Sequence, residues 1–162
     1  MIKNNLREAL ILAGGKGTRL SSILKGKPKP LVEIGEIPLL KHQINLLIRY
    51  GIKRINLLVN YKSEQIKSFL EKEFYNIDFK LYEDGQIPLG SGGSILKHLK
   101  NFDETFIVFY GDTFLEVDLD KFFHFHATNK SSLTVFAHPN THPYDSDVLI
   151  CNSKNQVMDT VS

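Results

Sequence analysis

The chain has little cysteine, little net charge and no long apolar run, and each shortage excludes a class of protein. Its 162 residues include one cysteine, Cys151, which cannot form an internal disulfide and suits a reducing cytoplasm. A formal net charge of +2 argues against a broad surface for nucleic acid. The apolar run Ala9 to Ala13 is too short for a signal sequence, and no stretch approaches the ~18 apolar residues of a membrane span. We therefore expect a cytoplasmic protein with no membrane or nucleic-acid partner.

Strand-like and helix-like segments alternate along the chain. We predict strands over residues 9–13, 55–59, 79–82, 105–110 and 132–136, and a hairpin that pairs 148–151 with 156–160. Helices are predicted over residues 38–50, 63–74, 94–99 and 119–129, with Ser63 as an N-cap. This alternation, in a chain of one-domain length, is typical of a single-domain α/β protein with a doubly wound, mostly parallel sheet.

A glycine-rich segment, L-A-G-G-K-G-T-R-L over residues 12–20, directly follows the first predicted strand. Glycines let the backbone approach a bulky anion because no Cβ stands in the way. The segment matches neither the P-loop nor the G-x-G-x-x-G dinucleotide motif. Taken alone, it is equally compatible with an ordinary strand-to-helix turn.

A second feature, Pro28-Lys29-Pro30, makes the anion-binding interpretation the stronger one. The two prolines restrict the backbone on either side of Lys29, which aims a flexible lysine at one place. Arg19 adds a planar guanidinium that matches phosphate oxygens, whereas Lys29 is a compact point charge. The combination predicts a site for a phosphorylated ligand such as a nucleoside triphosphate.

Two further segments follow later predicted strands. Residues 88–94, P-L-G-S-G-G-S, place glycines at the start of a helix, although a plain flexible loop is a serious alternative. Residues 110–113, Y-G-D-T, place Asp112 at the carboxyl end of a strand, where a carboxylate can hold Mg²⁺ against phosphate oxygens. Because ligands of open α/β sheets bind at the carboxyl ends of strands, we expect all these segments to meet there.

In this order, the segments resemble the sugar-1-phosphate nucleotidyltransferase family, whose pattern is roughly G-G-x-G-T-R-L, P-K-P-L, P-L-G-T-x-G and G-D. The likeness runs from about Glu8 to at least Asp147. Residues 83–85, 110–113 and 138–147 look like the branch that activates D-glycero-D-manno-heptose 1-phosphate, usually with GTP. The resemblance implies a Rossmann-like nucleotidyltransferase fold and guanylyl transfer to a heptose 1-phosphate. The products would be pyrophosphate and an NDP-sugar for surface glycans such as lipopolysaccharide.

The resemblance also implies a role for each matched residue. The catalytic residues would be Arg19, which grips the β- and γ-phosphates, Lys29, which grips the α-phosphate, and Asp112, which holds Mg²⁺. Leu89 and Gly90 would lie against the base and ribose, with Gln86 at the base edge. The nucleotide-binding set is then Leu12, Ala13, Gly14, Gly15, Gly17, Thr18, Arg19, Lys29, Gln86, Leu89, Gly90 and Asp112.

The sequence departs from the family pattern in one respect. Typical members continue past a strand like 156–160 into elements that grip the acceptor sugar and supply a second metal-binding aspartate. We therefore expect residues 1–162 to form a nucleotidyltransferase domain with a complete nucleotide-binding part and an incomplete acceptor-sugar part, as in a truncated or split enzyme. One alternative is a catalytically incomplete module that binds a nucleotide or NDP-sugar. Another is cytidylyl transfer to phosphocholine or another alcohol phosphate. A homo-oligomer is compatible with the sequence.

Overall fold

The computed structural model describes residues 8–15, 17, 24, 26–85, 89–139 and 147–161. The chain forms two compact units, Met1–Asp120 and Lys121–Ser162, and each is described by itself. Among the described residues, no helix combines the length and the apolar character needed to cross a membrane.

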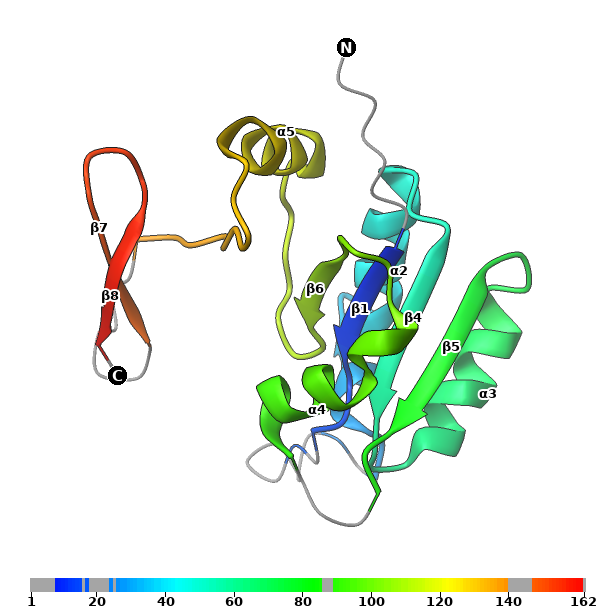
Figure 1. Ribbon diagram of the computed structural model, residues 1–162. Coiled ribbons are helices and arrows are strands. Elements are labelled where there is room, and N and C mark those ends of the chain that lie inside the picture. Colours follow the sequence, from blue (N-terminus) through cyan, green and yellow to red (C-terminus); the bar gives the residue numbers. More distant parts are fainter. Residues whose placement is uncertain are drawn as a thin grey trace. The chain divides into compact units, whose positions relative to one another are not determined.

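A four-stranded parallel sheet forms the centre of the first unit (Figure 1). Its strands are β1 (Glu8–Leu12), β4 (Arg54–Val59), β5 (Asp78–Glu83) and β6 (Ile107–Tyr110), in the order β5-β4-β1-β6. The register brings Leu12 opposite both Leu58 and Tyr110, so three strands end at the same level. The predicted strands in this unit and the parallel sheet are confirmed.

The two central strands are almost wholly apolar because both of their faces are covered. In β1, Ala9, Leu10 and Ile11 are fully buried. Glu8 is buried as well. Asn56 Nδ2 donates to its Oε1 at 2.6 Å, the backbone N–H of Asp103 donates to its Oε2, and the guanidinium of Arg54 lies 3.7 Å from Oε1. The buried carboxylate at the start of β1 therefore has hydrogen-bond partners on both of its oxygens.

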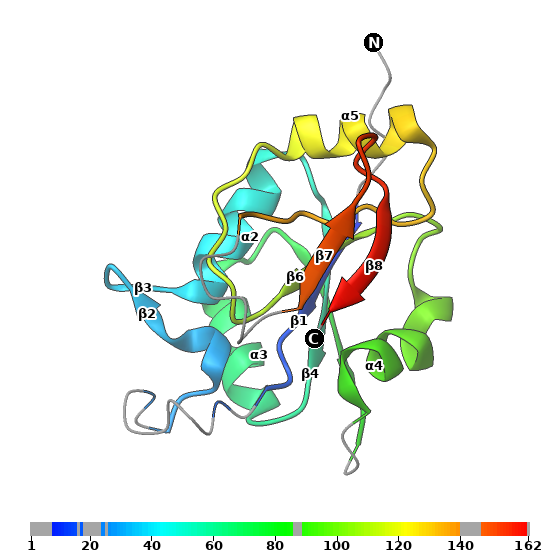
Figure 2. The same ribbon diagram turned by 90° about the vertical axis from the view of Figure 1, so that its left-hand side faces the viewer.

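In the part of the chain that the structure describes, three helices cover the sheet, as expected of a doubly wound fold. Two of them, α2 (Leu39–Arg49) and α3 (Ser63–Glu73), lie on one face, and α4 (Gly90–His98) lies on the other (Figures 1 and 2). Helix α2 follows Pro38, whose fixed φ suits a helix start. Its apolar stripe packs on the sheet, with Leu40, Ile44 and Leu47 fully buried.

Two predicted helix starts are wrong. Ser63 is the first helical residue and not the N-cap, because Lys62 occupies the cap position with φ 55° and no side-chain cap bond forms. Helix α4 begins at Gly90, four residues before the predicted start at Ser94, and is followed by the 3₁₀ turn η3 (Leu99–Asn101). The glycines and serines of its first turn have weak helix propensity, so the pattern hid that turn.

Short elements between β1 and α2 were not predicted. They are the 3₁₀ turn η2 (Lys29–Leu31) and the hairpin of β2 (Glu33–Ile34) and β3 (Ile37–Pro38). Gly35 and Glu36 connect the two strands with φ of 59° and 65°, the positive values that a tight hairpin turn requires. Strands of two residues are too short to show an alternating pattern.

The second unit contains most of α5 (Leu119–Asn129) and a hairpin of β7 (Val148–Cys151) and β8 (Val157–Val161). The strands pair antiparallel, with Val148 opposite Val161, so the predicted hairpin is confirmed and its second strand lies one residue later than predicted. The predicted strand over residues 132–136 is wrong, because this described segment has no regular structure. Its β-branched and aromatic residues suit a strand, but a strand also needs a neighbour for its backbone hydrogen bonds, and the ladders among the described residues do not include it.

Candidate active site

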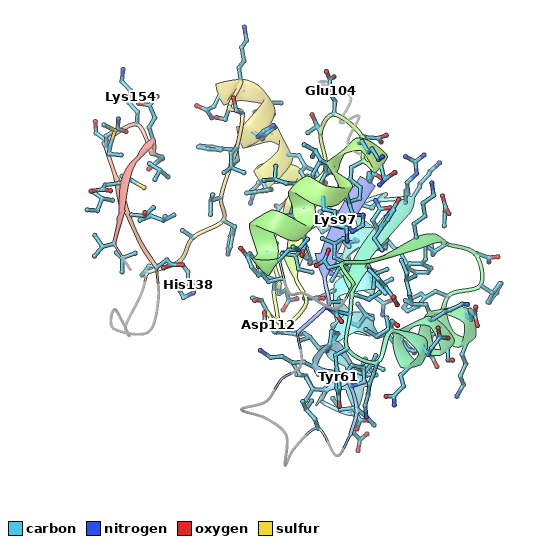
Figure 3. All side chains as sticks on the ribbon, turned by 60° about the horizontal axis from the view of Figure 1, so that its bottom comes forward. Tyr61, Lys97, Glu104, Asp112, His138 and Lys154 are labelled. Carbon is cyan, nitrogen blue, oxygen red and sulfur yellow. The ribbon has the colours of Figure 1, made fainter. Side chains whose placement is uncertain are left out.

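A pocket of about 320 Å³ lies at the carboxyl edge of the parallel sheet. Figure 3 turns this edge toward the viewer and labels Asp112, which stands there. The pocket is lined by residues that follow β1, β4, β5 and β6, together with η2 and the first turn of α4. Of the predicted nucleotide-binding residues, it brings together Leu12, Gly14, Gly15, Gly17, Lys29, Leu89, Gly90 and Asp112.

The other predicted residues do not line the pocket or are not described. Ala13 is buried, and its N–H donates to the Leu58 carbonyl at 2.8 Å, so it extends the sheet rather than facing the pocket. Thr18, Arg19 and Gln86 lie outside the described residues.

The glycine loop after β1 leaves open backbone on one side and is tightly packed on the other. A Cβ at Gly15 would meet nothing within 4 Å, so its backbone is accessible to a ligand. Gly17 has φ +65°, and a Cβ there would lie 2.6 Å from Leu24 Cδ1 and 3.1 Å from Lys29 Cβ. Glycine is favoured there because its φ is one that other residues adopt only with strain, and a side chain would also force Leu24 to shift.

Lys29 reaches the pocket from the short turn η2. Pro28 and Pro30, on either side of it, are buried and anchor the turn. Its ammonium Nζ lies 2.6 Å from Asp112 Oδ2, and the two side chains are 29% and 43% exposed. The structure thus brings the two predicted charges into one ion pair across 83 positions of sequence.

Asp112 is placed by the glycine before it. Gly111 donates its N–H to the Leu12 carbonyl at 3.0 Å, which carries the β1–β6 pairing one residue beyond the strand. A Cβ at Gly111 would lie 2.5 Å from that carbonyl oxygen. The close approach of the two backbones therefore requires glycine and sets the carboxylate of Asp112 at the edge of the sheet.

Asp112 fits a role as a ligand of a divalent cation. Among the described residues, no group of three or more His, Cys, Asp or Glu side chains could hold a metal alone. Mg²⁺ is usually held by only one or two carboxylates together with substrate phosphates, so a single aspartate suffices. The ammonium of Lys29 against Oδ2 shows that this carboxylate already attracts a cation.

Two polar residues of the pocket were missed by the sequence analysis. Asn60 follows β4 and Asp84 follows β5, and both line the pocket. Asp84 accepts a hydrogen bond from the Ser94 hydroxyl at Oδ2, and His98 Nε2 lies 3.4 Å from Oδ1. Position could have found both, because polar residues just after parallel strands face the ligand edge. Asp84 also lies in the segment 83–85, which resembles the heptose branch but was given no role in the site.

The pKa values that shift clearly lie away from this pocket. Hydrogen bonds and the charge of Lys27 lower the pKa of Glu33, and those of Lys41 lower the pKa of Glu73. Burial raises the pKa of Tyr82, and the charge of Glu8 adds to the effect. None of these three residues lines the pocket.

The first unit is an α/β fold whose pocket gathers an open glycine loop, an anchored lysine and a strand-end aspartate, an arrangement typical of nucleotide-binding proteins. The comparison with protein families agrees. The model of the nucleotidyl transferase family matches residues 8–158, and the chain belongs to that family.

Within that family, the chain is similar to curated heptose 1-phosphate guanylyltransferases. The chain is 44% identical over 114 residues to D-glycero-alpha-D-manno-heptose 1-phosphate guanylyltransferase of Campylobacter jejuni, covering 70% of this chain and 51% of the relative. It is 37% identical over 133 residues to the protein of the same name from Aneurinibacillus thermoaerophilus, covering 82% and 57%. The chain therefore spans little more than half the length of these relatives.

A solved structure shares the fold. HddC from Yersinia pseudotuberculosis superposes with a TM-score of 0.74 at 28% identity, covering 96% of this chain and 69% of that one. The same protein complexed with GMP-PN gives a TM-score of 0.73 at 27% identity. These matches confirm the predicted fold class and family.

Proposed function

We propose that the chain carries the nucleotide half of a guanylyltransferase that acts on a heptose 1-phosphate. The observation that carries the proposal is the Lys29–Asp112 pair, held at 2.6 Å on a pocket that the glycine loop also lines. Guanylyl transfer is supported by the two heptose 1-phosphate guanylyltransferases and by the nucleotide-complexed neighbour. The cytidylyl alternative is not favoured by these relatives.

The reaction needs positioning and charge stabilisation more than covalent help from the protein. An oxygen of the sugar phosphate attacks the α-phosphorus of GTP, a new P–O bond forms, and the bond to pyrophosphate breaks. Lys29 leaves Asp112 to hold the α-phosphate, and the backbone around Gly15 accommodates the triphosphate. Arg19, outside the described residues, is proposed for the β- and γ-phosphates.

The proposal also includes the expected contacts to base and ribose, the metal ion, the cellular location and the oligomeric state. Leu89 and Gly90 pack against base and ribose, with Gln86, outside the described residues, at the base edge. Asp112 would hold Mg²⁺, which when bound neutralises phosphate charge. The single cysteine supports a cytoplasmic location, and the product would serve surface-glycan synthesis. A homo-oligomer stays a proposal as well.

The test is pyrophosphate release from a panel of four nucleoside triphosphates. Each is offered with the 1-phosphates of heptose, mannose and glucose and with phosphocholine. The expected result is highest turnover with GTP and heptose 1-phosphate. GTP binding by calorimetry with no release on any acceptor would support the binding module, and release with CTP and phosphocholine would overturn the choice of substrate.

Two neighbouring lysines provide a matched pair of variants. Lys29→Ala should lower turnover by about 10² or more, because a charge aimed at the reacting phosphate is lost. Lys27→Ala removes a lysine that pairs with Glu33 at 2.6 Å outside the pocket, and turnover should stay near wild type. Arg19→Ala should behave like Lys29→Ala. Unchanged turnover in both Arg19→Ala and Lys29→Ala would contradict the proposed mechanism.

A further inference from the structure

Gln43 is a buried polar residue on the apolar face of α2, and its side chain reaches the loop after β6. It is 3% exposed. Its amide nitrogen Nε2 lies 2.8 Å from the Tyr110 carbonyl and 2.8 Å from the Thr113 carbonyl. A primary amide has two N–H donors, so each carbonyl receives one of them.

These two carbonyls bracket Gly111 and Asp112. Residues 110–113 form a turn that is closed by a bond from the Thr113 N–H to the Tyr110 carbonyl at 3.1 Å. Gly111 ties the turn to β1 through the Leu12 carbonyl. The turn that carries Asp112 is therefore held at its base by the sheet and at both ends by one side chain from α2.

The residue beside Gln43 secures the chain beyond the turn. His42 Nε2 lies 2.9 Å from the Ile34 carbonyl, and its ring meets Phe114 edge-on with centroids 5.3 Å apart. Helix α2 thus contacts the backbone of the turn and the residue that follows it. The helix that packs on the sheet also fixes the exit of the loop.

Packing alone does not account for Gln43. Its Oε1 is buried and finds no hydrogen-bond partner among the described residues. An unpaired carbonyl oxygen in the core is unfavourable, and a methionine of similar length would fill the space without it. The feature that a methionine lacks is the pair of N–H donors that reach the turn.

We propose that Gln43 is a positioning residue that sets the carboxylate of Asp112 for a divalent cation on the nucleotide phosphates. The proposal rests on the function proposed above. Gln43 touches neither nucleotide nor cation and acts through the backbone of the turn. Without its two donors, the carbonyls of Tyr110 and Thr113 are released and the aspartate samples a wider range of positions.

The first experiment needs no ligand. Amide hydrogen exchange is measured in wild type, in Gln43→Met and in Ile44→Val, a control that trims a fully buried neighbour on the same helix. Gln43→Met should speed exchange at Gly111 and Thr113, the two turn residues whose N–H groups are hydrogen-bonded, by about tenfold more than in β1, because the turn loses its hydrogen bonds to α2. Ile44→Val should loosen these sites no more than the sheet. Equal exchange at the turn in wild type and Gln43→Met overturns the proposal, whether or not the chain binds GTP.

The second experiment follows Mn²⁺ by electron paramagnetic resonance in the presence of GTP. Asp112→Asn marks the loss of the carboxylate ligand. Gln43→Met should weaken Mn²⁺ binding by about tenfold, and Gln43→Glu by more, since a carboxylate would face two carbonyl oxygens. Metal-free GTP affinity should stay near wild type in Gln43→Met. Wild-type Mn²⁺ affinity in a folded Gln43→Met chain overturns the positioning role. A wild-type chain that binds no GTP counts against the proposed function instead, and the exchange experiment then decides the role of Gln43.

Discussion

The ammonium of Lys29 and the carboxylate of Asp112, 2.6 Å apart, neutralise each other when no ligand is present. A triphosphate that takes Lys29 must therefore draw it away from a negative partner. The pair weakens the binding of a triphosphate that carries no metal ion, because the carboxylate of Asp112, once Lys29 has left it, repels the phosphates. Removal of the Asp112 carboxylate is therefore expected to strengthen metal-free nucleotide binding, whereas removal of an active-site side chain usually weakens it.

Asp112→Asn should bind metal-free GTP more tightly than wild type. The gain should be about fivefold, the effect of removing one unit charge some 4 Å away in a water-like dielectric. Calorimetry in the presence of a chelator measures it. Asp78→Asn, a matched change at the start of β5 and outside the pocket, should leave the affinity unaltered. Weaker metal-free binding by Asp112→Asn would show that the carboxylate does not compete for Lys29.

The same glycine-to-alanine change should have opposite effects at two positions. Gly111→Ala should lower the free energy of unfolding by about 1–3 kcal/mol, since its Cβ would lie 2.5 Å from the Leu12 carbonyl oxygen. Gly92→Ala, inside α4 with open space around it, should raise it by about 0.5–1 kcal/mol. Urea unfolding measures both, and equal effects would refute the close approach of β1 and β6.

Ser94→Ala should destabilise the segment around Asp84. The hydroxyl of Ser94 donates to the carboxylate of Asp84, whose side chain is mostly buried, and its removal should lower the free energy of unfolding by about 1–2 kcal/mol. Ser68→Ala on the exposed surface of α3 should change it by no more than about 0.5 kcal/mol. Urea unfolding of the two variants, compared at one pH, decides the matter. Indistinguishable curves would remove Ser94 from the support of the pocket.

The Lys41–Glu73 pair between α2 and α3 should make stability depend on acid. The hydrogen bond and charge of Lys41, 2.5 Å away, lower the pKa of Glu73 below 4.5 in the folded chain. Its contribution is therefore present above pH 4.5 and is lost as the pH falls through the lower, folded value. Glu73→Gln should be less stable than Glu71→Gln at pH 7, and this difference should shrink in acid. Urea unfolding of both variants at pH 7 and at acidic pH tests it. A stability difference that grows in acid would contradict the lowered pKa of Glu73.

The central sheet could be predicted because β1, β4 and β6 are largely apolar runs, as a buried parallel sheet requires, and β5 alternates apolar and polar residues. Residues 132–136 show the limit of that reasoning. Their composition suits a strand, but whether a strand forms depends on a neighbour that the local sequence does not specify. Helix α4 shows the reverse case, since a first turn of glycine and serine forms although its propensity is weak.

Part of the pocket was predictable for a related reason. The glycine loop, Lys29 and Asp112 are unusual residues in a fixed order, so the sequence itself marks them. Asp84 lies in a segment that resembles the heptose branch but received no role in the site, and Gln43 is not marked at all. Gln43 lies on the apolar face of α2 among leucines. Only the folded structure shows that its amide donates to two carbonyls of a turn far away in sequence.

The backbone bonds that continue the sheet past its strands have a consequence for recognition. Ala13 bonds to Leu58, and Gly111 bonds to Leu12, so the start of the glycine loop and the turn of Asp112 belong to the same hydrogen-bonded ladder as β1. That wall of the pocket is preorganised, and a ligand that docks on it loses little affinity to ordering the backbone. Discrimination between ligands then falls to the side chains that must move, and Lys29 is the first of them.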